Sequence, residues 1–124
     1  MKAELLFDAG AFALFIDERP VSYCRPLPLD EEYEPEEQEQ RAWYSLGCGI
    51  REAISESVEF LTVTSYTKVV DQLQGVAIED PIAVRMSQEI ITKGLTKFIH
   101  VIYSKVSPEE SERRLADAAN DLEG

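Results

Sequence analysis

The spacing of apolar and polar positions changes along the chain and predicts strands first and helices later. Near the N-terminus, short apolar runs are separated by turn residues such as Gly10 and Pro20, which is typical of an antiparallel meander. After residue 36, apolar residues recur at helical spacing, as in helices that pack on a sheet. The predicted strands are 3–8, 11–17, 21–25, 58–64 and 98–103, and the predicted helices are 36–56, 66–73, 81–97 and a last helix from 107 onward.

The longest predicted helix carries an apolar stripe and two glycines. Each interior glycine costs about 1 kcal/mol relative to alanine, so Gly47 and Gly49 predict a close approach of this helix to the sheet. The stripe consists of Ala42, Leu46, Cys48, Ile50, Ala53 and Ile54. In the helix that begins at Pro81, the positions expected to face the core are Ile82, Met86, Ile90 and Ile91.

Length and net charge limit the number of domains and the kinds of partner that this chain can have. A chain of 124 residues with 44% apolar positions matches one globular domain. The net charge of −12 keeps a protein soluble and makes nucleic acid an unlikely partner, because nucleic-acid binding normally needs a basic surface. A local basic patch or bridging metal ions would be needed to reverse this expectation. The acidic run 30–37 is expected to be a solvated loop, and the alternative is a mimic of nucleic acid that binds a basic protein.

Cysteine and histidine positions give no sign of a metal or redox site. Cys24 and Cys48 lack the spacing of such pairs, and one histidine cannot complete a Cys/His zinc site. We therefore expect small buried thiols, and His100 as a packed or hydrogen-bonded strand residue. No signal-peptide pattern and no apolar run of roughly 20 residues is present, which predicts a cytoplasmic protein without a membrane segment.

Several stretches resemble the ribonuclease H family in the same order. Residues 39–44 resemble its Asn-Asn-Arg-Ala-Glu-Tyr stretch, and 51–53 stand where its helix has Leu-Glu-Ala. Residues 64–75 resemble Gly-Asp-Ser-x-Leu-Val-Val-Asn-Gln-Leu-Asn-Gly, which is the most specific match, and 106–111 resemble Val-Pro-Arg-Glu-Glu-Asn. The elements predicted above follow the order βββαβααβα, which is also the order of this family, and together they indicate one α/β domain over residues 1–124. The resemblance implies a mixed five-stranded sheet, flanked by helices, in the strand order 3-2-1-4-5.

The resemblance also implies a place for metal-dependent chemistry. Family members cut the RNA strand of RNA–DNA hybrids with two divalent cations held by clustered carboxylates. The positions that correspond to those carboxylates are Asp8, Trp43, Ser65 and Leu115. Asp8 is the only carboxylate among them, and it has an alternative role as an acceptor of backbone N–H groups in the next turn. Glu39, one helical turn before Trp43, and Asp117, two residues after Leu115, are substitutes of uncertain value.

These replacements predict a domain without bound metal that has lost nuclease activity and acts as a binding or assembly module. The expected partner is a protein, which includes a second copy of the chain. Trp43, Tyr44 and Tyr66 would form an aromatic interaction surface, since Trp and Tyr are favoured at interfaces. Alternatively, Trp43 fills the space of the metals or packs under the Pro-rich loop. The edge strand 21–25 offers a route for strand pairing.

The competing hypothesis is a divergent nuclease that acts on RNA–DNA hybrids or other nucleic acid. It would use Mg²⁺ or Mn²⁺, held by Asp8, Glu39 and Asp117. This hypothesis requires that the three carboxylates converge within reach of one ion.

Overall fold

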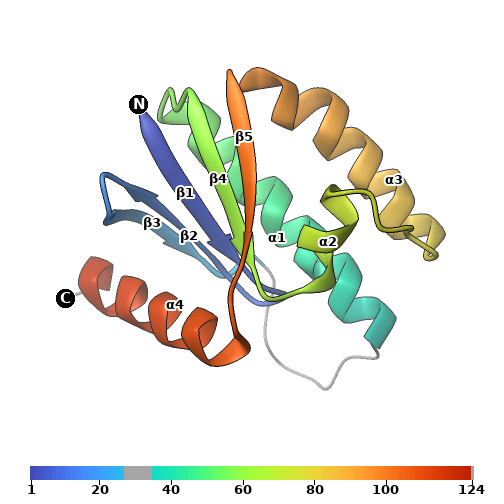
Figure 1. Cartoon of the computed structure of the whole chain (residues 1–124). Helices are drawn as coiled ribbons and strands as arrows, with labels where there is room; N and C mark the ends of the chain where they lie inside the picture. Colours follow the sequence, from blue (N-terminus) through green and yellow to red (C-terminus); the bar gives the residue numbers. More distant parts are fainter. Residues whose placement is uncertain (27–34, 124) are drawn as a thin grey trace.

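A mixed five-stranded sheet lies at the centre of the computed structural model, which describes residues 1–26 and 35–123. The strand order is β3-β2-β1-β4-β5, as predicted (Figure 1). The first three strands form an antiparallel meander, and β4 and β5 continue the sheet parallel to β1. The strands are β1 (Lys2–Phe7), β2 (Phe12–Ile16), β3 (Arg19–Cys24), β4 (Phe60–Ser65) and β5 (His100–Lys105).

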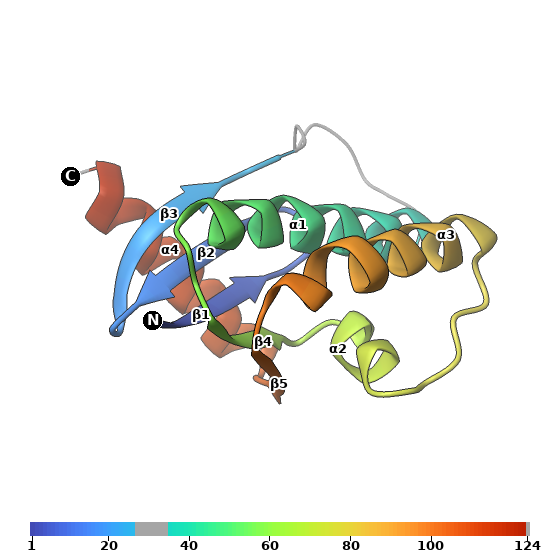
Figure 2. The ribbon, with the colours of Figure 1, turned by 90° about the horizontal axis from the view of Figure 1, so that it is seen from above.

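Helices cover both faces of this sheet. Figure 2 shows α1 and α3 on one face and α4 on the other. The four α-helices are α1 (Pro35–Ser55), α2 (Lys68–Leu73), α3 (Pro81–Glu89) and α4 (Pro108–Glu123). The predicted order βββαβααβα is confirmed, but the helix expected over 81–97 is α-helical only to Glu89. It continues as a π-helical segment, Ile90–Gly94, and a 3₁₀ turn, Leu95–Lys97.

Alternation along β1 divides the core between the two faces, as expected for a period of two. Leu5 and Phe7 belong to the large cluster under α1, whereas Leu6 packs with Leu115 of α4. A Cβ on Gly49 would lie 2.5 Å from Leu5 Cδ1, so the predicted close approach of α1 to the sheet is confirmed there.

The apolar pattern was a poorer guide to which helix positions face inward. Ile54, Ile82 and Ile91 are 39%, 51% and 41% exposed, so their predicted core positions are wrong. In α3 the small residues Ala83 and Ser87 are buried instead. Gly47 also differs from prediction, because a Cβ there would touch Ile90 Cδ1 at 3.4 Å and not the sheet. Close packing of α3 on α1 favours small side chains, which an apolarity pattern does not reveal.

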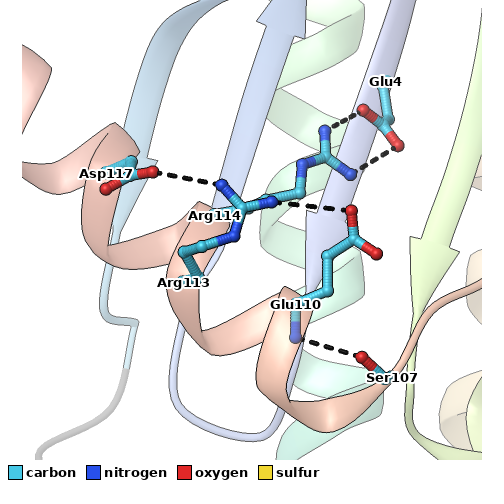
Figure 3. Close-up of polar contacts among 6 residues, drawn as sticks. All are labelled: Glu4, Ser107, Glu110, Arg113, Arg114 and Asp117. Atoms are coloured by element: carbon cyan, nitrogen blue, oxygen red, sulfur yellow. Dashed lines mark hydrogen bonds and ion pairs between the residues drawn. The ribbon is translucent and has the colours of Figure 1, made fainter.

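A half-buried ion pair holds α4 on the sheet. The Arg114 guanidinium donates to both carboxylate oxygens of Glu4 (Figure 3). It also lies 5.0 Å from the centroid of the Phe15 ring. Thr64 Oγ1 also donates to Glu4 Oε2, at 2.7 Å. Burial alone would raise the pKa of Glu4, but the hydrogen bonds from Arg114 and Thr64 and the Arg114 charge lower it below its ordinary value.

Two expectations about isolated side chains were wrong. Cys24 is exposed and Cys48 is only half-buried, so neither is the fully buried thiol that was expected. His100 lies on β5 as expected but is exposed. Cys24 ends β3 and His100 begins β5, the two edge strands, where fewer neighbours cover a side chain. In the part of the chain that the structure describes, no helix is long and apolar enough to cross a membrane.

Candidate functional site

An open groove of about 1070 Å³ lies between the turn after β1 and α4. The end of β3, the beginning of α1 and the segment after β4 complete its walls. We call it the Asp8 groove. Its lining includes Asp8, Arg25, Arg41, Tyr66, Glu112 and Leu115.

Asp8 has the turn-stabilising role that the sequence left open. Its Oδ1 accepts hydrogen bonds from the backbone N–H groups of Gly10 and Ala11, at 2.8 and 2.9 Å. Burial raises the pKa of Asp8 above its ordinary value, and the two N–H groups and the Arg25 charge oppose that rise. The carboxylate of Glu112 raises the pKa further by repulsion. Asp8 therefore combines a structural bond with an incompletely balanced charge.

Trp43 is completely buried, so it does not contribute to an exposed aromatic surface. Its indole Nε1–H donates to Gln72 Oε1 on α2, at 3.1 Å. An indole has one donor and no oxygen ligand for a metal. Trp43 therefore packs between α1 and α2 as a buried, hydrogen-bonded side chain.

Glu39 takes part in the same buried hydrogen-bond chain. Its Oε1 accepts from Gln72 Nε2 at 2.5 Å, and its Oε2 lies 3.3 Å from Lys68 Nζ. We call Trp43, Gln72, Glu39 and Lys68 the α1–α2 network. Glu39 lines a separate groove that also contains Lys68, and not the Asp8 groove. The Glu39 carboxylate therefore links α1 to α2 through its contacts with Gln72 and Lys68.

Ser65 ends β4 and is fully buried. Its Oγ donates to the carbonyl oxygen of Phe7 at 2.8 Å and accepts from the backbone N–H of Thr67 at 3.0 Å. The hydroxyls of Ser65 and Thr67 are also 2.8 Å apart. Ser65 therefore links the ends of β4 and β1 through its own hydrogen bonds.

The structure places Leu115, and not Asp117, at the Asp8 groove. Asp117 is exposed and pairs with Arg113 of the same helix, 3.5 Å away (Figure 3). Asp117 lines a third groove, beside Glu4. Residues two apart on a helix are separated by about 200° around its axis, which explains why only one of them lines the Asp8 groove.

Glu112 is a groove residue that the sequence reasoning missed. It lies one turn before Leu115 on α4, lines the Asp8 groove and acts on the Asp8 pKa. Its three-residue spacing from Leu115 was the available signal, because side chains at that spacing share a helix face.

The three predicted aromatic residues are in different places. Tyr66 is half-buried in the Asp8 groove, and burial raises the pKa of its hydroxyl. Tyr44 is 42% exposed and lines a groove between α1 and α3. With Trp43 buried, these side chains do not form one continuous surface.

The residues present do not fit a paired-metal centre. Asp8, Glu39 and Asp117 line three different grooves. Across residues 1–26 and 35–123, no group of three or more His, Cys, Asp or Glu side chains is arranged to hold a metal ion. Asp8, Glu112 and Glu123 line one groove. They are not among side chains arranged to hold one ion, and a pair of oxygen-seeking cations needs a tighter cluster of carboxylates.

Comparisons with known proteins identify the fold. The chain superimposes on the N-terminal RNase H domain of a Mycobacterium tuberculosis protein, which was solved as a fusion with maltose binding protein. The TM-score is 0.69 and the sequence identity 12%, and the match covers 93% of this chain and 95% of the other. The chain also superimposes on RNase H1 of the halophilic archaeon Halobacterium salinarum, with a TM-score of 0.69 and 15% identity. That match covers 98% of this chain and 99% of the other. No protein-family model and no curated protein sequence matches. The chain has a ribonuclease H-like fold.

Proposed function

We propose that this chain is a ribonuclease H-like domain without metal-dependent nuclease activity, which works as a binding or assembly module. The observation that supports the proposal is the state of three positions where carboxylates were expected. Trp43 is buried and hydrogen-bonded, Ser65 has its hydroxyl engaged, and Leu115 is apolar.

The chemistry of phosphodiester cleavage explains why these positions matter. Two cations activate water and stabilise the leaving oxygen, and anionic ligands must hold them beside an anionic phosphate. Loss of several ligands removes most of the affinity for such ions. The net charge of −12 further disfavours a nucleic acid in the groove.

A protein partner fits the surface beside the Asp8 groove. The edge strand β3 supplies residues to the groove wall, and Val21 of this strand is 41% exposed. Arg25, just after β3, and Tyr66, just after β4, add cationic and aromatic groups to the same groove, which Asp8 and Glu112 also line. The acidic run proposed as a nucleic-acid mimic lies largely outside the described residues, so its placement does not enter this argument.

Hydrolysis of an RNA–DNA hybrid is the direct test. Wild-type protein and the Asp8→Asn variant would be incubated with labelled hybrid in Mg²⁺ and, separately, in Mn²⁺. We expect no cleavage by wild type beyond the background of the variant. Cleavage by wild type that Asp8→Asn abolishes would overturn the proposal and favour the divergent nuclease.

Self-association can be tested by sedimentation at several protein concentrations. Strand pairing through β3 predicts a dimer that Val21→Lys dissociates, because a charge on an edge strand opposes pairing. Val76→Lys makes the same change at an exposed position outside the sheet and serves as the control. A wild-type monomer at all concentrations would exclude the second copy and leave a different protein as the proposed partner.

A further inference from the structure

A second groove, between α1 and α3, is independent of the Asp8 groove. It has a volume of about 340 Å³, within the range of small-molecule sites. Its apolar lining includes Ile50, Ile54, Met86 and Ile90, and the buried Trp43 lies directly behind this lining. We call it the interhelical groove.

Two glycines and a change of helix type shape this groove. At Gly94 a Cβ would lie 3.0 Å from Ile50 Cγ2, so the two segments approach closely there. Gly47 has no side chain opposite Ile90, which leaves space between the helices. Ile90–Gly94 is π-helical, and such wide turns occur frequently at functional sites.

The rim of the interhelical groove is cationic. Arg51 on α1 and Lys93 on the π-helical segment both line it, with Glu89 as the acidic residue of the lining. Within the described residues, neither Arg51 nor Lys93 forms an ion pair. In a chain of net charge −12, a groove with two cations and one anion stands out as a local positive site.

We propose that the interhelical groove binds a small organic anion with an apolar body and one acidic group. The apolar body lies against Ile50, Met86 and Ile90, and the acidic group is held by Arg51 and Lys93. The charge of the rim complements a single anion, and the volume suits a small molecule better than a helix of a partner protein. This proposal does not depend on the function of the Asp8 groove.

Anilinonaphthalene sulfonate has this chemistry and is a suitable probe. Trp43 is the only tryptophan of the chain and lies beside the groove, so energy transfer from Trp43 to the probe reports binding, and the groove variants below assign that binding to this groove. We expect saturable transfer with the folded wild-type protein. N-phenylnaphthylamine, which lacks the sulfonate, measures the apolar contribution alone.

The double variant Arg51→Gln/Lys93→Gln separates charge from shape. It should weaken sulfonate binding about tenfold and leave the neutral probe unaffected, because only the charge-assisted contacts are removed. The matched control is Arg85→Gln/Lys97→Gln, which removes two cations of the same kinds from positions on the neighbouring segments outside the groove lining. This control should bind both probes like wild type.

Gly47→Leu provides an independent steric test. The leucine side chain would occupy the space beside Ile90 and should weaken the binding of both probes. Absence of saturable transfer in wild type, or equal sulfonate binding by wild type and the Arg51→Gln/Lys93→Gln variant, would overturn the proposal. The rim variant changes only polar side chains, so it decides the question even where Gly47→Leu fails to fold.

Discussion

The α1–α2 network and the Asp8 groove differ in how their polar groups are balanced. In the network, Trp43, Gln72 and Glu39 are buried and hydrogen-bonded to one another, and Lys68 compensates the Glu39 charge. In the groove, Asp8 and Glu112 repel each other. Buried groups that are paired inside the protein support the fold, whereas incompletely balanced charges are typical of sites that meet another molecule.

Trp43→Ala should have the largest effect on stability. Removal of a fully buried indole leaves a cavity and takes away the hydrogen-bond donor to Gln72, so we expect a loss of about 3–5 kcal/mol in the free energy of unfolding. Urea unfolding followed by circular dichroism would measure it. Trp43→Phe, which keeps most of the volume, should cost less. A loss below about 1 kcal/mol for Trp43→Ala would contradict a structural role for the network.

The two glycines of α1 give the next contrast. Gly49→Ala places a Cβ 2.5 Å from Leu5, so we expect destabilisation of about 1–3 kcal/mol despite the better helix propensity of alanine. Gly47→Ala meets Ile90 only at contact distance and should be neutral or stabilising by up to about 1 kcal/mol. Thermal unfolding of both variants would compare them, and equal effects would show that helix propensity decides, and not packing.

Glu4, unlike Asp8, has its charge balanced by an ion pair, so its substitution tests how much such a pair stabilises the fold. Glu4→Gln should cost about 1–2 kcal/mol near pH 7, because the bidentate contact with Arg114 loses its charge. The pKa of Glu4 is lowered in the folded protein, so the stabilisation by its charge is present above its ordinary pKa of 4.5 and is lost as the pH falls through the folded pKa. Unfolding of wild type and variant should therefore converge in acid, and a constant difference would contradict this ion-pair explanation.

Asp8→Asn should have the smallest effect and the opposite sign. The amide oxygen still accepts from Gly10 and Ala11, while the charge that burial and Glu112 disfavour is removed. The pKa of Asp8 is raised in the folded protein, so wild type has its full stability below the ordinary pKa of 3.8, where Asp8 is protonated, and loses part of it as the pH rises through the folded pKa. We expect a gain of under about 1 kcal/mol near pH 7 that disappears in acid. Destabilisation near pH 7 would instead show that the charge of Asp8 supports the fold, as the paired groups of the α1–α2 network do.

The sheet order was predictable because turn residues, changes of period and the motif resemblance agree along the chain. The surroundings of single side chains were less predictable. The sequence left Trp43 open between a surface role and a packing role, because its position depends on Gln72, which is 29 residues away along the chain. Asp117 and Leu115 could be distinguished only after the rotation of α4 was known, and Glu112 was missed for the same reason.

Metal titration followed by NMR tests the central claim most directly. The backbone amides of Gly10 and Ala11 donate to Asp8 and therefore report on any ion that its carboxylate binds. We predict no saturable shift of these amides up to about 10 mM Mg²⁺, and no selective broadening by Mn²⁺ relative to amides near other exposed carboxylates such as Asp117. A saturable, selective change at Gly10 and Ala11 in the low millimolar range would contradict the proposal that this domain holds no catalytic metal.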